Sequence, residues 1–362
     1  PGRADGVPAL TAAAGEPERP AALDGAGDEP ADLPRPGPLR GLTLGDCSQA
    51  LQDVYDAVLF DLDGVLYVGA AGVPHAAESV AAARSQGMRI AFVTNNASRR
   101  PAVVAEHLAS LGIPAQPVDV VTSGQAAVRD LVEHLQPGSA VLIVGTPGLA
   151  ELVHEAGLRP VRTVEAAGPN GPRAVVQGLD TATSWNDLAE ASIAIRAGAR
   201  WVAGNLDSTY PSERGPLPGN GAMVAALVTA TGRRPLVVGK PEPALHRESV
   251  ERVGAARPLV VGDRLDTDVL GAVRAGSDSL LVLTGVTDPD DLFAAPAGMR
   301  PTYLASDLRG LLAGHEAPRL VGGEAMCGAA TASYDGTRLV TSGGGDDALR
   351  AACALSWHRA DN

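Results

Sequence analysis

The sequence is poor in three features that mark whole classes of protein. Its 362 residues include only three cysteines, Cys47, Cys327 and Cys353, which are too few and too scattered for a disulfide framework or a zinc site. No apolar run reaches the ~20 residues that a membrane-spanning helix needs. Aromatic residues make up 3% of the chain, so the core must be built from Val, Leu, Ile and Ala. These shortages favour a protein of a reducing cytoplasm.

Basic residues are also scarce. Lysine and arginine together number 29 against 42 acidic residues, which gives a formal charge of −13. A field of that sign repels phosphate backbones and anionic lipids, so we expect neither a nucleic acid nor a membrane as partner. The hydrophobic share of 45% and the charged share of 20% are ordinary for globular proteins. The length suggests two to three domains of roughly 150 residues each.

A single basic residue, Lys240, is a lysine; the others are arginines. A compact ammonium and a planar guanidinium suit different sites, so one lysine in an arginine-rich chain can mark a functional position. It can equally be a chance survivor of a composition that disfavours lysine. Composition alone does not distinguish these two interpretations.

The chain changes character after its first 46 residues. Residues 1–46 contain eight prolines and no aromatic residue, and such a segment cannot bury enough apolar surface to offset its ordering entropy. We predict a disordered tail there. From Tyr55 onward, short apolar runs alternate with helix-like stretches, which predicts an α/β architecture with a buried parallel sheet. The predicted strands are 57–60, 90–93, 118–121, 141–144, 174–177, 201–203, 236–238, 259–261 and 280–283, and the predicted helices include 76–86, 101–111, 188–197, 222–230 and 244–253.

The last part of the chain predicts a small appendage, residues 316–362. Residues 329–334 and 337–341 flank Asp335-Gly336, which is typical of a two-residue hairpin. A helix over 346–357 follows. This ββα unit is too small for a core of its own, so we expect it to dock on the main body.

Two polar motifs follow predicted strands in the first half. Asp61 and Asp63 come directly after strand 57–60, and Gly64 permits a turn. Two carboxylates at such spacing point the same way and repel unless a cation lies between them, although a solvated Asp-Gly turn would look the same. After strand 90–93, Thr94-Asn95-Asn96 can cradle phosphate oxygens or simply cap a helix.

Two more motifs follow later strands. Lys240 lies after strand 236–238, and an acidic loop that contains Asp263 and Asp268 lies after strand 259–261. Carboxylates of this kind suit Mg²⁺, although each motif alone would also fit an exposed loop. Ligands bind at the carboxyl ends of parallel strands. If one parallel sheet brings all four motifs to one edge, they predict a Mg²⁺-dependent phosphate site.

Taken in order, Asp61-Leu62-Asp63-Gly64-Val65, Thr94-Asn95-Asn96, Gly239-Lys240-Pro241 and Gly262-Asp263 through Asp268 resemble the motifs of haloacid dehalogenase superfamily phosphatases. The resemblance extends over about residues 53–312 and is narrower to the nitrophenyl-phosphatase and phosphoglycolate-phosphatase branch, whose late-cap signature is similar to residues 205–222. It implies a Rossmann-like core of residues 47–138 and 235–315, with an α/β cap inserted at 139–234.

The resemblance also implies roles for the motif residues. Asp61 would be the nucleophile that forms an aspartyl-phosphate, and Asp63 the general acid and base. Mg²⁺ would be held by the side chains of Asp61 and Asp263 and the backbone carbonyl of Asp63. The remaining roles are phosphoryl binding by Thr94, Asn95 and Asn96, charge balance by Lys240, and orientation of the lysine or a metal-bound water by Asp268.

The implied function is hydrolysis of a small phosphomonoester. An acid at Asp63 separates phosphatases from dehalogenases, which lack it. The composition and the C-terminal appendage resemble actinobacterial members that act on glycerol 3-phosphate. Phosphoglycolate, sugar phosphates, pyridoxal phosphate and nitrophenyl phosphate stay open as substrates, as do a phosphotransferase or mutase and a metabolite-binding module without turnover.

Within the cap, Gly219, Asn220 and Gly221 either face the substrate or cap the helix 222–230, and Glu213 and Arg214 are further polar candidates. Capped relatives often dimerise through the cap, so a homodimer is expected.

Overall fold

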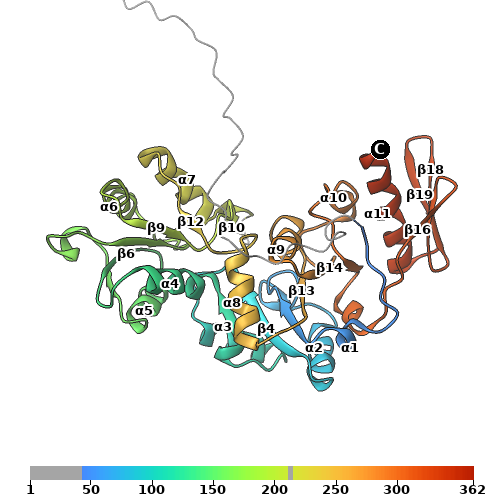
Figure 1. Ribbon diagram of the computed structural model, residues 1–362, viewed down its shortest axis with the longest axis horizontal. Helices are drawn as coiled ribbons and strands as arrows, with labels where there is room; N and C mark the ends of the chain where they lie inside the picture. Colours follow the sequence, from blue (N-terminus) through green and yellow to red (C-terminus); the bar gives the residue numbers. More distant parts are fainter. Residues whose placement is uncertain (1–42, 211–214) are drawn as a thin grey trace, which may run out of the picture. The chain divides into compact units, whose positions relative to one another are not determined.

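The computed structural model (Figure 1) describes residues 43–210 and 215–362, all within one unit of the chain, residues 34–362. Most of the predicted disordered tail, residues 1–42, lies outside the described residues, as do Glu213 and Arg214. The last four residues of that tail are ordered, against the prediction. Leu44 is buried, and the backbone N–H of Gly45 donates to the carbonyl of Thr302 at 2.7 Å. A short segment of this kind is ordered by the surface that it lies on, which its composition does not reveal.

The core sheet has six parallel strands in the order β15-β14-β13-β1-β4-β5. Its strands are continuous apolar runs because both faces are covered. In β1, for example, Val58 and Phe60 pack into one buried cluster and Leu59 into another. The strands are β1 (Ala57–Phe60), β4 (Arg89–Thr94), β5 (Val120–Thr122), β13 (Pro258–Gly262), β14 (Asp278–Val282) and β15 (Tyr303–Ala305).

A second sheet has five parallel strands in the order β12-β9-β8-β6-β7. Its strands are β6 (Ala140–Val144), β7 (Arg159–Val161), β8 (Ala174–Gln177), β9 (Arg200–Ala203) and β12 (Leu236–Val237). This is the sheet of the expected α/β cap.

One strand of the second sheet corrects the prediction. The run 236–238 was expected to lie in the core sheet, but β12 pairs with β9, with Leu236 opposite Val202. Lys240 therefore follows a strand of the cap sheet. An apolar run indicates a buried strand but not which of two sheets the strand joins. The domain limits expected from the sequence stay proposals.

The helices cover both sheets. One apolar cluster joins one face of the core sheet to α1, α2 and α3. A second cluster includes the other face of the core sheet, α4, α8 and α9, and continues through α5 into the cap sheet. The far face of the cap sheet is covered by α6 and α7. The helices are α1 (Leu51–Val54), α2 (Ala76–Ser85), α3 (Pro101–Ser110), α4 (Ser123–His134), α5 (Pro147–Glu155), α6 (Trp185–Arg196), α7 (Asn220–Thr231), α8 (Pro243–Val253), α9 (Leu270–Ala275) and α10 (Pro289–Phe293).

Several helix starts follow from side-chain caps that the sequence already shows. Thr122 accepts a hydrogen bond from the N–H of Gln125 at 3.2 Å ahead of α4, and Ser184 accepts one from Asp187 ahead of α6 at 3.3 Å. Such capping boxes satisfy backbone donors that have no partner within the helix. Two short hairpins complete this part of the chain, β2 (Tyr67–Val68) with β3 (Ala71–Gly72) and β10 (Thr209–Tyr210) with β11 (Leu217–Pro218).

The C-terminal appendage has the predicted hairpin and helix, as β18 (Ala330–Asp335), β19 (Arg338–Ser342) and α11 (Gly345–Asp361). Two strands were not predicted, β16 (Arg319–Val321) and β17 (Glu324–Cys327). They complete a four-stranded antiparallel sheet, so the unit is larger than ββα. The two strands are short and carry no strongly apolar run, which explains why they were missed.

The appendage docks on the core, as expected. Arg300 pairs with Asp361 through two hydrogen bonds of 2.6 and 2.7 Å, and the indole N–H of Trp357 donates to the carbonyl of Leu292 at 2.9 Å.

Over the described ranges, no helix combines the length and apolar character that crossing a bilayer requires.

Candidate active site

The polar motifs of three core strands meet at the carboxyl edge of the sheet. The register places Phe60 of β1 opposite Val261 of β13 and Phe92 of β4. Asp61 follows β1, Thr94 ends β4 and Asp263 follows β13. The parallel sheet therefore brings these three motifs together, as the sequence predicted.

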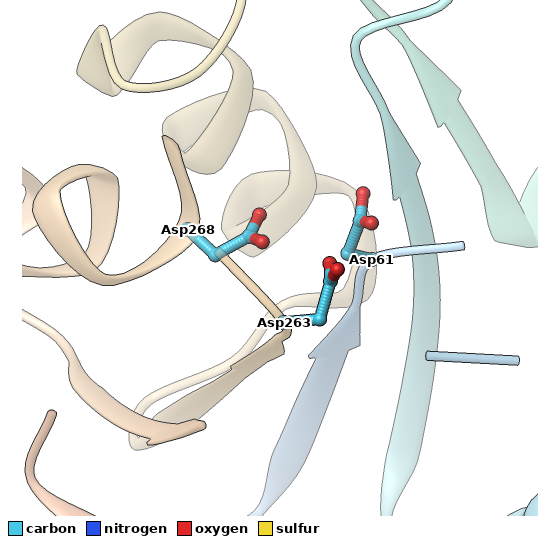
Figure 2. A group of neighbouring side chains, drawn as sticks. All are labelled: Asp61, Asp263 and Asp268. Atoms are coloured by element: carbon cyan, nitrogen blue, oxygen red, sulfur yellow. The ribbon is translucent and has the colours of Figure 1, made fainter. Parts of the chain in front are cut away.

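Three carboxylates face one another at this edge. Asp61, Asp263 and Asp268 each offer an oxygen, and these oxygens lie within 4.8 Å of one another, as Figure 2 shows. One oxygen of Asp263 accepts the N–H of Val286 at 2.7 Å, while its Oδ1 is buried and has no hydrogen-bond partner in the described part of the chain. A buried carboxylate oxygen that faces two other carboxylates fits a cation, and an all-oxygen donor set fits Mg²⁺.

Lys240 lies in the loop that follows β12 of the cap sheet, and its side chain contacts two of these carboxylates. Its side chain is 4% exposed, and its ammonium donates to Asp61 and, at 2.7 Å, to Asp268. Asp268 itself lies in a single π-helical turn, Leu265–Val269, an irregularity frequent at functional sites. A buried ammonium between two carboxylates favours the functional interpretation of the lone lysine over chance.

The pKa values of Asp61, Asp263 and Lys240 reflect the close approach of their charges. Burial raises the pKa of Asp61 well above its usual value, although Lys240 opposes the shift. Burial and the neighbouring Asp268 raise the pKa of Asp263 to about 6. Burial alone would lower the pKa of Lys240, but Asp268 and Asp61 raise it above its usual value. A cation between the carboxylates would relieve their repulsion.

Asn95 has a structural task. Its side-chain oxygen accepts the N–H of Lys240 at 2.7 Å, and its amide donates to the carbonyl of Lys240 at 3.1 Å. Asn95 thus ties the lysine loop, which leaves the cap sheet, to the core. The hydroxyl oxygen of Thr94 accepts the N–H of Asn96 at 3.1 Å. Phosphoryl binding by these three residues stays a prediction.

Asp63 lies on the open side of the site. Its side chain is exposed, yet the surrounding protein atoms desolvate the carboxylate and raise its pKa against the charges of Arg99 and Lys240. The turn that follows needs glycine at Gly64, because φ is +87° and a Cβ atom would collide with the carboxylate of Asp263.

Several supporting residues were not predicted. The backbone carbonyl of Asn95 accepts hydrogen bonds from Ser123 and Asn205, both at 2.6 Å. Asp207 is held near the amide of Asn95 at 3.5 Å, and burial raises its pKa. The signal for Asn205 and Asp207 was their place in the late-cap signature, and only contacts show what they do.

The segment Gly219–Gly221 caps a helix. Gly219 is the N-cap of α7, and the amide of Asn220 donates to the carbonyl of Asn205 at 2.8 Å. Of the two interpretations that the sequence allowed, these contacts favour the structural one.

Comparison with known proteins agrees with this geometry. Two family models match, described as haloacid dehalogenase-like hydrolase over residues 58–159 and as HAD-hydrolase-like over residues 237–311. The chain is 53% identical to D-glycerol 3-phosphate phosphatase of Mycobacterium tuberculosis over 263 residues, 73% of this chain and 72% of the relative. It is 36% identical to 5'-nucleotidase YutF of Bacillus subtilis over 64% of this chain and 89% of that one.

Solved structures are similar as well. Glycerol phosphate phosphatase Rv1692 of Mycobacterium tuberculosis, in complex with magnesium, has a TM-score of 0.75 and 47% identity, covering 86% of this chain and 92% of that one. The p-nitrophenyl phosphatase of Archaeoglobus fulgidus has a TM-score of 0.66 and 31% identity, covering 71% and 98%. The chain therefore belongs to the haloacid dehalogenase-like hydrolases and, within that family, is a phosphatase.

Proposed function

We propose that the enzyme hydrolyses glycerol 3-phosphate to glycerol and phosphate, with Mg²⁺ as its cofactor. The observation that carries this proposal is the carboxylate cluster of Asp61, Asp263 and Asp268, in which Asp263 has a buried oxygen without a partner among the described residues and Asp61 pairs with Lys240. The choice of substrate is supported by the 53% identity to a D-glycerol 3-phosphate phosphatase. The choice of metal is supported by the magnesium complex of a similar structure.

Asp61 is the proposed nucleophile. One of its carboxylate oxygens bonds to phosphorus while the bond from phosphorus to the ester oxygen breaks, which leaves an aspartyl-phosphate. Lys240 pairs with Asp61 and Asp268, so it keeps the nucleophile oriented and offsets negative charge. Asp61, Asp263 and the backbone carbonyl of Asp63 would hold Mg²⁺, which when bound offsets the repulsion between Asp61 and the phosphate dianion.

Asp63 is the proposed acid and base. Its raised pKa favours a carboxyl group that carries a proton, which it gives to the departing glycerol oxygen. The resulting carboxylate then takes a proton from the water that attacks the aspartyl-phosphate, and phosphate leaves Asp61. The hydroxyl of Thr94 and the amide of Asn96 are the proposed donors to the phosphoryl oxygens, with Asn95 as a further candidate.

The test is phosphate release from a panel of monoesters, with Mg²⁺ and with a chelator. The panel contains glycerol 3-phosphate, 2-phosphoglycolate, a sugar phosphate, pyridoxal phosphate, a nucleoside monophosphate and nitrophenyl phosphate. We expect glycerol 3-phosphate to have the highest kcat/KM and the chelator to abolish release. Another leading substrate would refute the substrate assignment and keep the chemistry. No release from any compound by the folded enzyme would refute both.

The working environment is also part of the proposal. A net charge of −13 supports a cytoplasmic enzyme that acts on a free metabolite, without nucleic acid or membrane as partner. A homodimer is supported by Trp185 and Ile193, which lie on one face of α6 and are 79% and 53% exposed. Light scattering that gives the mass of a single chain would refute the dimer.

A further inference from the structure

Three polar side chains beside Asp63 have no hydrogen-bond partner among the residues that the structure describes. They are the guanidinium of Arg99, the hydroxyl of Tyr67 and the Nε2 atom of His107, which is buried. Buried polar atoms are normally satisfied, because an unmade hydrogen bond costs stability, so the Nε2 atom of His107 calls for a partner. Arg99 is exposed, and its guanidinium is open to a ligand. Together these groups indicate a site for a polar ligand.

Arg99 is placed by its neighbours in the loop after Thr94-Asn95-Asn96. Its backbone N–H donates to Asn96 at 3.3 Å. The next residue, Arg100, pairs with Glu151 and Glu155 of α5 at 2.7 and 2.5 Å, so its charge is neutralised. Arg99 has no such carboxylate among the described residues, and its charge lowers the pKa of Asp63 against the effect of burial. The guanidinium thus acts on the proposed acid through its charge.

Tyr67 and His107 are placed by the β2 hairpin and by α3. Residues 63 and 67 form a β-bridge, and the N–H of Gly64 donates to the carbonyl of Tyr67 at 2.8 Å. The rings of Tyr67 and His107 meet edge to face, with centroids 4.7 Å apart. Burial, then Asp63 and Asp61, raise the pKa of the Tyr67 hydroxyl, in agreement with the β-bridge that holds Tyr67 next to Asp63.

We propose that Arg99, Tyr67 and His107 form a leaving-group subsite that binds the hydroxyl groups of a short polyhydroxy alkyl chain. The subsite rests on the proposed function, because Asp63 gives its proton to the ester oxygen and its neighbours must therefore surround the leaving group. One cation with two neutral polar groups matches hydroxyls. An apolar leaving group would leave all three groups unpaired, and a second phosphate dianion would meet only one positive charge.

This chemistry predicts strong discrimination. A site built to hydrogen-bond a hydroxyl rejects the analogue that lacks it by far more than a pocket rejects a missing methylene. The matched pair of ligands is glycerol 3-phosphate and n-propyl phosphate, which has the same carbon chain without the two hydroxyls. We expect kcat/KM to be at least roughly 100-fold higher for glycerol 3-phosphate.

The variants are Arg99→Ala, Tyr67→Phe and His107→Phe, with Arg247→Ala as control. Arg247 is an exposed arginine of α8 without an ion-pair partner among the described residues. Each test variant should lower kcat/KM for glycerol 3-phosphate by roughly tenfold or more beyond its effect on n-propyl phosphate. The comparison is made between the two ligands because loss of the Arg99 charge also acts on Asp63. The control should change neither. Equal losses on both ligands, or a wild-type enzyme that does not prefer glycerol 3-phosphate, would overturn the subsite.

A binding measurement separates this proposal from the proposed function. In the Asp61→Asn background, calorimetry with Mg²⁺ measures the affinity for both ligands without turnover. The subsite is supported if this variant binds glycerol 3-phosphate more tightly than n-propyl phosphate and if Arg99→Ala and Tyr67→Phe remove that preference. This holds even if the wild type releases no phosphate and the proposed function fails. Similar affinities for both ligands refute the subsite, whatever the turnover. Tighter binding of 2-phosphoglycolate than of glycerol 3-phosphate, if it depends on Arg99, also refutes the subsite, because the three side chains would then recognise a carboxylate rather than hydroxyls.

Discussion

Asp63 and Asp61 differ in what each contacts, and that difference separates their roles. Asp61 is held by a buried ammonium, whereas Asp63 is exposed and forms a β-bridge with Tyr67. Asp61→Asn should abolish turnover, because an amide keeps the shape but is not a competent nucleophile. Asp63→Asn should slow turnover by roughly 10²–10⁴-fold, the usual contribution of one acid-base group. Steady-state phosphate release measures both, and near-full activity of Asp61→Asn would show that the site is wrongly assigned.

Asp263 is positioned by the segment that follows β14. Val286 donates its N–H to the side chain of Asp263 at 2.7 Å, and Thr287 donates to its carbonyl at 3.1 Å. Between β14 and Val286, a Cβ atom on Gly285 would collide with the Asp263 carboxylate. We predict that Gly285→Ala weakens Mg²⁺ binding by at least about tenfold, because the carboxylate must move to make room. Calorimetric titration with Mg²⁺ measures the effect.

The control for that variant is Gly344→Ala, at a glycine with an ordinary φ of −149° and no atom within 4 Å of an added Cβ. It should bind Mg²⁺ like the wild type. Unchanged affinity in Gly285→Ala would contradict a positioning role for this segment.

His246 makes stability depend on pH. It is 1% exposed, and burial, reinforced by Lys240 and opposed by Asp268, lowers its pKa from 6.5 to about 4. The unfolded state then binds the proton more readily, so the contribution of His246 to stability is complete above pH 6.5 and is lost as pH falls towards 4. Urea unfolding should show a loss of about 2 kcal/mol from this group between pH 7.5 and pH 5. A His246→Leu variant with the same pH dependence as the wild type would contradict this.

At the scale of elements, α11 fastens the appendage to the core. Trp357 is 3% exposed, packs beside Leu304 and Leu292 in one buried cluster, and has the guanidinium of Arg300 5.2 Å from its ring centre. Trp357→Ala should lower the free energy of unfolding by about 3–5 kcal/mol, as for other large core residues. It should leave kcat/KM nearly unchanged, because the site residues lie on β1, β4 and β13 and on loops outside the appendage.

Chemical denaturation and phosphate release on the same preparation measure this prediction. Met326→Ala, at a side chain of β17 that is 41% exposed, is the control and should be near neutral. A large loss of kcat/KM in a folded Trp357→Ala enzyme would give the appendage a part in catalysis. Both matched family models end before it, at residues 159 and 311.

In the appendage, the local sequence pattern predicted two of the four strands. The hairpin of β18 and β19 was predicted from Asp335-Gly336, because a two-residue turn fixes the register of both strands. β16 and β17 have no comparable signal, and their pairing depends on β18 being in place. An edge strand is defined by its neighbour more than by its own composition.

For the whole molecule, metal binding should be coupled to stability. Oxygens of three carboxylates lie within 4.8 Å of one another. A ligand that binds there only in the folded state stabilises that state by mass action. Mg²⁺ at 100 times its Kd should raise the free energy of unfolding by about 2.7 kcal/mol. Thermal melting with and without chelator measures the gain. Asp263→Asn should abolish it, and an equal gain in that variant would place the metal elsewhere.

The sequence by itself determined which residues of the core strands meet at the candidate site; their chemical roles are proposals. Asp61, Asp63, Thr94 and Asp263 were found because polar residues that directly follow buried parallel strands must emerge at one edge, a local rule that needs no distant contacts. Lys240 was found because it is a solitary lysine. The α/β class followed from the period of the apolar runs.

Only the tertiary structure decided the features that depend on residues far apart in the chain. It placed β12 in the cap sheet rather than the core, because an apolar run does not specify its neighbour. It showed that the side chain of Asn95 hydrogen-bonds to the backbone of Lys240. It also showed that Leu44 packs in one buried cluster with Leu304 of β15. Within the described residues, it also showed that the side chains of Arg99 and Tyr67 and the Nε2 atom of His107 have no hydrogen-bond partner. Such a lack is a property of the folded surroundings that no stretch of sequence contains.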